Sequence, residues 1–211
     1  MADSLSNISG KSGMAPGSLV HVGEVHITWS RISLLSYNKE TIEERAVESM
    51  EDISQYKDLQ AVTWVIVEGL SNVEVIESVG KLFDVHPLVL EDILNTHQRP
   101  KFEEHENYLY IVLKGLLPEE ATFSIHYEQI SILIFENVVF TFKEKVDDMF
   151  MPVIQRIKNS RGRFRSLGTD YLAHAILDII VDQNFGIIDS LAETIDAVEE
   201  EILTNPTASS L

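Results

Sequence analysis

The chain has 211 residues, 45% of them hydrophobic, which is enough for one domain with a core of its own. It contains no cysteine, which excludes disulfide scaffolds, thiolate zinc sites and cysteine nucleophiles, and fits a reducing cytosol. A formal net charge of −18 argues against nucleic acid as a partner, because phosphate binding depends on Lys and Arg. The same charge favours cations or basic partners.

The N-terminal third predicts a tail followed by strands and a helix. Residues 1–18 are small, polar and rich in Gly and Ser, so we expect a disordered tail over residues 1–22 and no signal peptide. The loose alternation of His26–Tyr37 predicts a strand. A capping-box pattern at Thr41–Glu44 predicts a polar helix over residues 41–56. Ala61–Val67, which reads AVTWVIV, predicts a short strand buried on both faces.

The middle of the chain alternates between helix and strand patterns. Helical spacing of apolar residues predicts a helix over Asn72–Phe83, and Pro87 suits the first turn of a second helix that ends near Asn95. A further strand is expected at Tyr108–Leu117. Two strands with a turn at Glu136–Asn137 and a short helix follow: Thr122–Phe135, Val138–Lys143 and Val146–Lys158.

Thr169–Leu203 predicts one long amphipathic helix with Thr169 as its cap. At about 100° per residue, six of its acids fall within an arc of roughly 60°. This acidic stripe consists of Asp178, Asp182, Asp189, Glu193, Asp196 and Glu200. No Lys or Arg lies on the helix to relieve the repulsion, so the stripe is either a solvated face or a surface for cations or basic groups.

Interleaved helices and strands, followed by locally paired strands, predict an α/β fold: a mixed β-sheet flanked by helices in an α/β/α sandwich, with a long acidic helix after it. The expected division is a tail at 1–22, an α/β domain at 23–165, and at 166–211 a helix that packs on the domain. No apolar run approaches the ~18 residues of a membrane span, so we expect the chain as given to be soluble.

The sequence lacks the common catalytic and nucleotide-binding motifs, which predicts that the chain is not an enzyme. A cluster of His97, Glu103, Glu104 and His105 could hold a transition metal, although a surface loop is the simpler interpretation. Five bases lie between Arg156 and Arg165, and pairing with the acidic surface explains them better than an anionic ligand.

Three acids are the best candidates for binding a cation. Glu91 and Asp92 are adjacent on the helix that starts at Pro87 and point about 100° apart. Taken alone, both could be ordinary solvent-facing residues. Asp178 lies among apolar residues of the long helix, and a carboxylate at such a boundary tends to have a partner.

The run HPLVLEDILNTHQRPK, from His86 to Lys101, resembles the cytoplasmic domain of CorA-type magnesium channels. The similarity extends over about Ile27–Leu203 and includes VTWVIVEGL, ENYLYIVLKGL, EQISILIF and DYLAHAILDIIVDQNF. The family implies a domain of a homopentamer that lies at the cytoplasmic face of the inner membrane. In the family, this domain is followed by a stalk helix and two transmembrane segments, the first ending in Gly-Met-Asn.

The resemblance implies a site for regulatory Mg²⁺, with Co²⁺ or other divalent cations as further ligands, between neighbouring subunits. Glu91 and Asp92 match the acidic pair of the family site, and Asp178 matches the aspartate of the long helix. A further aspartate comes from the neighbour's stalk helix, which has no match here. The expected function is therefore to sense Mg²⁺ and favour the closed channel, while the fragment alone is expected to be a monomer or weakly associated.

Two alternatives stay open at this point. One is the zinc-transporting branch of the same superfamily, although a cysteine-free, carboxylate-rich composition favours a harder cation. The other is a free-standing acidic module that binds a basic protein through the acidic stripe.

Overall fold

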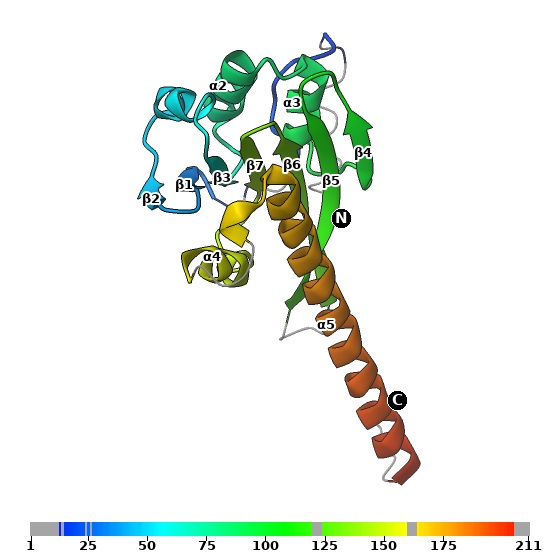
Figure 1. Ribbon diagram of the computed structural model, residues 1–211. Helices are drawn as coiled ribbons and strands as arrows, with labels where there is room; N and C mark the ends of the chain where they lie inside the picture. Colours follow the sequence, from blue (N-terminus) through cyan, green and yellow to red (C-terminus); the bar gives the residue numbers. More distant parts are fainter. Residues whose placement is uncertain are drawn as a thin grey trace.

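The computed structural model describes residues 13, 15–23, 25, 27–119, 124–159 and 164–204. Within these residues, seven strands form one mixed sheet (Figure 1). The strands are β1 Arg31–Tyr37, β2 Ile42–Ala46, β3 Val62–Glu68, β4 Lys101–Glu104, β5 Leu109–Glu119, β6 Ser124–Ile134 and β7 Val138–Lys143. They lie in the order β2-β1-β3-β7-β6-β5-β4, and all neighbours are antiparallel except the central pair β3 and β7.

The alternation of side chains along β3 explains why helices cover both faces of the sheet. Val65 and Val67 enter one apolar cluster, whereas Trp64 and Ile66 enter the other. The first cluster is covered by the 3-10 helix η1 (Met50–Tyr56), α2 (Val73–Phe83) and α3 (Pro87–Leu94). The second is covered by α4 (Met151–Lys158), the 3-10 helix η2 (Phe164–Ser166) and α5 (Thr169–Thr204). The structure thus confirms the predicted α/β/α arrangement and the long helix that follows it.

Several predicted boundaries agree with local chemistry. The side chain of Asn72 accepts a hydrogen bond from the Glu74 amide and caps α2. The turn between β6 and β7 closes as expected, with the Phe135 amide 2.8 Å from the Val138 carbonyl oxygen. β1 begins five residues after the predicted start at His26, which lies outside the described residues.

The predicted polar helix over residues 41–56 is wrong. The Asn38 side chain accepts hydrogen bonds from the amides of Glu40 and Thr41, both at 2.8 Å, and this turn reverses the chain after β1. Residues 42–46 then pair with β1 as an edge strand, and only Met50–Tyr56 is helical. The polar character of this segment therefore reflects a solvent-exposed strand at the edge of the sheet.

Residues 15–23 lie against α3 although most of them belong to the predicted tail. Val22 is buried, and its amide and carbonyl group bond to Leu94 and Thr96 as a short parallel bridge. Packed chain thus extends to the N-terminal side of residue 23. Residues 1–12 and residue 14 lie outside the described residues, so disorder at the start of the chain stays a prediction.

The first half of α5 packs on the sheet and the second half extends away from the domain as a rod (Figure 1). Leu172, Ile176 and Ile180 are buried, whereas residues after Asn184 are mostly exposed. Thr169 does not cap the helix as predicted, because its hydroxyl donates to the Phe135 and Glu136 carbonyls at the β6–β7 turn. No helix within the described ranges combines the length and apolar character needed to cross a membrane.

Candidate cation-binding acids

The fold of α3 places Glu91 and Asp92 on its outer side. Pro87 occupies the first turn, and the ring nitrogen Nδ1 of His86 accepts a hydrogen bond from the Leu88 amide at 3.2 Å. Val89, Leu90, Ile93 and Leu94 are buried against the sheet and α2. The two intervening acids are therefore left at the surface, each partly exposed.

Asp92 is already held by two side chains. Its Oδ2 atom lies 2.5 Å from Nζ of Lys101, and its Oδ1 atom accepts a hydrogen bond of 2.7 Å from Nε2 of Gln98. Lys101 comes from the edge strand β4 and also contacts Glu103 at 2.7 Å. Asp92 and Lys101 each keep about a quarter of their side-chain surface exposed, 25% in both cases.

The pKa values of Lys101 and Glu103 reflect the hydrogen bonds that the Lys101 ammonium donates. Burial lowers the pKa of Lys101, but its hydrogen bonds to Asp92 and Glu103 outweigh burial and leave the pKa raised. The hydrogen bond from Lys101 lowers the pKa of Glu103 below its usual range. Lys101 is thus a stable ammonium ion between two carboxylates.

Glu91 is held by the N-terminal segment. Its Oε2 atom accepts a hydrogen bond of 2.6 Å from the backbone amide of Gly17. Gly17 has a φ of 84°, a left-handed conformation in which glycine is favoured. The segment before β1 therefore contributes to the position of this carboxylate.

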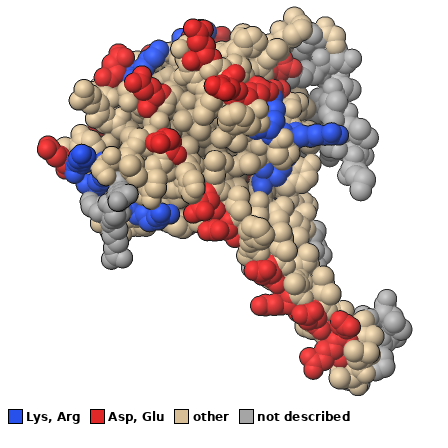
Figure 2. Space-filling model, turned by 45° about the vertical axis from the view of Figure 1, so that its right-hand side comes forward, with Lys and Arg blue, Asp and Glu red and all other residues tan. Residues whose placement is uncertain are grey.

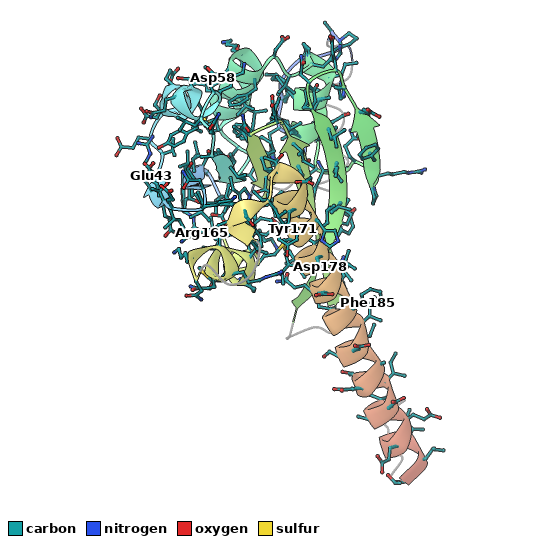
Figure 3. All side chains as sticks on the ribbon, in the orientation of Figure 1. Glu43, Asp58, Arg165, Tyr171, Asp178 and Phe185 are labelled. Atoms are coloured by element: carbon teal, nitrogen blue, oxygen red, sulfur yellow. The ribbon has the colours of Figure 1, made fainter. Side chains whose placement is uncertain are left out.

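Asp178 projects outward from α5 (Figure 3). Its neighbours Ile176 and Ile180 are buried against the sheet, which turns Asp178 to solvent. The partner expected for Asp178 is not found among the described residues, where it makes no hydrogen bond or ion pair.

One chain does not bring the three acids together. α3 covers the sheet face on which Val65 and Val67 lie, whereas α5 covers the opposite face. Among the described residues, no group of three or more His, Asp or Glu side chains is arranged to hold a metal ion. The donors fit Mg²⁺ in type, because this ion prefers carboxylate oxygens and water, but each chain supplies them on two separate surfaces.

The remaining acids of the stripe lie along the exposed part of α5, and Figure 2 shows acidic groups gathered along this rod. Asp182, Asp189, Glu193, Asp196 and Glu200 are all exposed. The apolar side of the rod is exposed as well, with Phe185 at 60% and Ile195 at 58%. Beyond the domain, α5 thus presents both an acidic and an apolar surface.

The transition-metal cluster considered at His97, Glu103, Glu104 and His105 does not form. Glu103 is engaged by Lys101, and the His105 ring stacks on Tyr108 with 4.4 Å between ring centroids. Glu103 and Glu104 also lie on strand β4, where a surface loop was expected.

Three bases of the basic run make contacts within the chain, and one of them, Arg156, lies over the Phe164 ring at 5.5 Å from its centroid. Lys158 lies 2.5 Å from Glu44, and the Arg165 guanidinium donates to the carbonyls of Ile157 and Lys158 at the end of α4. Arg161 and Arg163 lie outside the described residues.

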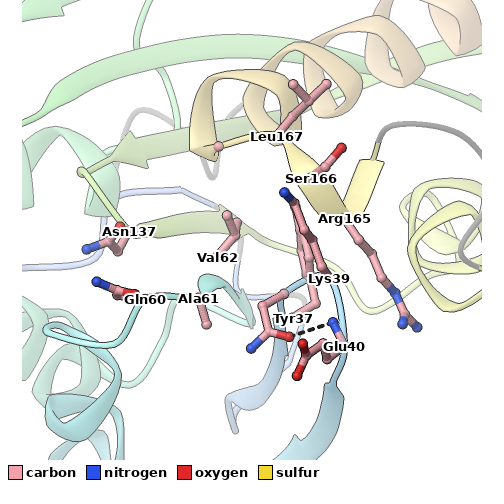
Figure 4. A pocket seen from close by; sticks show the side chains of 12 residues that line it. Tyr37, Lys39, Glu40, Gln60, Ala61, Val62, Asn137, Arg165, Ser166 and Leu167 are labelled. Carbon is pink, nitrogen blue, oxygen red and sulfur yellow. Dashed lines mark hydrogen bonds between the residues drawn. The ribbon is translucent and has the colours of Figure 1, made fainter.

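Arg165 also lines a hollow of about 490 Å³ between the β1–β2 turn and the start of α5 (Figure 4). Its charged residues include Lys39 and Glu40, and the Arg165 guanidinium lies across the hollow from Asn137. Two bases and one acid, Lys39, Arg165 and Glu40, are its charged lining residues, and none of the three candidate acids lines it.

The sequence nominates the three acids as candidates, but it does not indicate that Gln98 and Lys101 contact Asp92. The part played by Gln98 and Lys101 depends on how β4 folds back beside α3, and this pairing of β4 with β5 is not encoded locally. The only available signal was that both residues lie in the HPLVLEDILNTHQRPK run.

Comparison with known proteins supports the same family along most of the chain. Residues 59–211 match the family model described as CorA-like Mg²⁺ transporter protein. The cobalt/magnesium transport protein CorA of Thermotoga maritima is 38% identical over 199 residues, which cover 94% of this chain and 56% of that protein. The chain therefore spans little more than half the length of this relative.

Solved structures show the same fold at lower sequence identity. The soluble domain of CorA from Methanocaldococcus jannaschii superposes with a TM-score of 0.61 at 20% identity, covering 84% of this chain and 67% of that one. The full-length CmaX protein gives a TM-score of 0.68 at 14% identity, covering 88% and 55%. The family model, the Thermotoga relative and the shared fold together establish that this chain belongs to the CorA-like Mg²⁺ transporter family.

Proposed function

We propose that this chain is the cytoplasmic Mg²⁺-sensing domain of a homopentameric CorA-type channel. In this proposal, Glu91 and Asp92 of one subunit and Asp178 of its neighbour hold a regulatory Mg²⁺ between them. Occupied sites favour the closed state, and loss of the ion favours opening. Co²⁺ and other divalent cations of similar coordination are expected to compete for the same carboxylates.

The observation that carries the proposal is the placement of the acids on opposite faces of one sheet. A carboxylate on α5 that makes no bond to any described residue is an incomplete ligand set, and so is the acidic pair on α3. Contact between α3 of one copy and α5 of the next would combine these halves into a site, which is the arrangement a subunit interface needs.

Charge repulsion between the subunits couples cation binding to gating. Each chain carries a formal net charge of −18, and five such chains in a ring repel one another. Divalent cations at the interfaces would screen that repulsion and hold the ring symmetric. When the cytosolic ion concentration falls, the interfaces loosen and the open state becomes more favourable.

Transport by the full-length protein tests this proposal. Asp92→Asn and Asp178→Asn should each weaken inhibition by internal Mg²⁺, because each removes a negative charge from the same intersubunit site. Asp58→Asn is the matched control: it removes the same charge at an exposed position far from Asp178 (Figure 3). Unchanged inhibition in both site variants, or equal weakening in the control, would reject the site.

A further inference from the structure

Lys101 occupies the position at Asp92 that a cation would need. Its ammonium group lies between two carboxylates, 2.5 Å from Asp92 Oδ2 and 2.7 Å from Glu103 Oε1. With Gln98 on the other oxygen, both carboxylate oxygens of Asp92 are engaged before any metal ion binds. A Mg²⁺ ion on Asp92 would face a positive charge at close range, so full occupancy by both is electrostatically unfavourable.

The fold positions Lys101 for this contact. Side chains alternate along β4, so Lys101 and Glu103 share one side of the strand while Phe102 and Glu104 are exposed on the other. The Lys101 ammonium also lies 5.1 Å from the centroid of the buried Tyr110 ring, a distance suited to a cation–π contact. These contacts keep the ammonium beside α3 when no other cation is present.

Lys101 is also free to leave. Its side chain remains partly exposed at the edge of the sheet, and its four-carbon stem is flexible. An ammonium group that swings into solvent regains its hydration at little cost, which distinguishes it from a fully buried partner. The ion pair between Lys101 and Asp92 is therefore stable enough to form and weak enough for another cation to replace Lys101.

We propose that Lys101 is a tethered counter-ion that competes with Mg²⁺ for Asp92 and so sets the ion concentration at which the sensor responds. This inference rests on the proposed function, and it assigns to Lys101 a role opposite to that of a ligand. A residue that merely orients Asp92 would strengthen Mg²⁺ binding, whereas a competitor weakens it. Removal of the lysine therefore separates the two roles by the sign of the effect.

The test is a MgCl₂ titration of the full-length protein at constant ionic strength. Mg²⁺ binding is measured as protection against thermal unfolding, and the midpoint is the Mg²⁺ concentration that gives half of this protection. Lys101→Met should lower the Mg²⁺ midpoint by roughly 3- to 10-fold, as expected for loss of one competing, partly exposed charge. Lys101→Arg keeps the charge and should stay near the wild-type midpoint. Without divalent ions, Lys101→Met should be less stable than wild type, and this gap should close as Mg²⁺ is added.

Lys81→Met provides the control for net charge. Lys81 also forms an ion pair, with Glu77 on α2 at 2.7 Å, but it is far more exposed and does not contact Asp92. An equal shift in Lys81→Met and Lys101→Met, or a raised midpoint in Lys101→Met, overturns the inference. A wild-type protein that shows no Mg²⁺ protection overturns the proposed function itself, and the role of Lys101 with it.

Discussion

Glu128 links the stability of the domain to pH. This side chain is 1% exposed, and its Oε1 atom accepts hydrogen bonds from the amides of Glu144 and Lys145 at 2.9 and 3.1 Å. The other oxygen, Oε2, has no hydrogen-bond partner among the described residues. Burial raises the pKa of Glu128 to about 7, although the nearby charge of Lys143 acts in the opposite direction.

The direction of the pH effect follows from proton binding. Because the folded protein holds this proton more tightly than the unfolded chain, stability falls as the pH rises from about 4.5 through about 7. A pKa raised from 4.5 to about 7 corresponds to roughly 3 kcal/mol of unfolding free energy at pH above both values. Glu128→Gln removes this penalty, because the amide stays neutral and its oxygen can still accept the two backbone hydrogen bonds.

Urea unfolding of wild type and Glu128→Gln between pH 5 and pH 8 measures the effect. The variant should gain stability relative to wild type as the pH rises, by up to roughly 3 kcal/mol across the range. Glu136→Gln, at the exposed β6–β7 turn, measures the contribution of net charge alone. A difference between wild type and Glu128→Gln that is constant with pH would show that burial does not perturb this carboxyl.

Three further predictions concern the attachment of α5 and two glycine positions. Asn184 fastens α5 to β5, since its side chain bonds the Leu116 amide at 2.8 Å and the Lys114 carbonyl at 3.0 Å. Asn184→Ala should cost about 1–3 kcal/mol and speed hydrogen exchange where α5 leaves the sheet, whereas Thr194→Ala on the exposed rod should change neither. Gly69 has a φ of 86°, and a Cβ there would collide with the Trp29 carbonyl oxygen, so Gly69→Ala should lower the thermal midpoint. Gly186→Ala, which meets open space on α5, should raise the midpoint through roughly 1 kcal/mol of helix propensity.

The sequence predicted the elements whose signal is local. The apolar run of β3 and the cap and spacing of α2 require no knowledge of distant residues, and both elements lie within a residue or so of the predicted ends. The prediction for the segment after β1 is wrong because its local capping pattern favours a helix, whereas its pairing with another strand favours a β-strand. The turn at Asn38 and the pairing of Leu35 with Glu44 decide its structure, and both depend on β1.

The candidate site shows the same limit. Glu91, Asp92 and Asp178 could be chosen from sequence, because carboxylates and a family resemblance point to them. Their placement on opposite faces follows from the path of the chain through the sheet, which no spacing along the sequence reveals. Lys101 follows Asp92 by nine residues, but only the return of β4 beside α3 turns that separation into a contact of 2.5 Å.

A chain of polar contacts connects the two surfaces that carry the acids. The buried Gln129 side chain donates to the Asp92 carbonyl and accepts from the Gln98 amide. Lys114 donates to the Thr96 carbonyl, just beyond α3, and the Lys114 carbonyl in turn accepts from Asn184 on α5. These bonds are partly buried, and the Gln129 side chain is fully buried, so a displacement of α3 is opposed by contacts that also anchor α5. If Mg²⁺ binds between subunits as proposed, an ion that displaces α3 would therefore also act on α5 of the same chain, whose acids would belong to the next site.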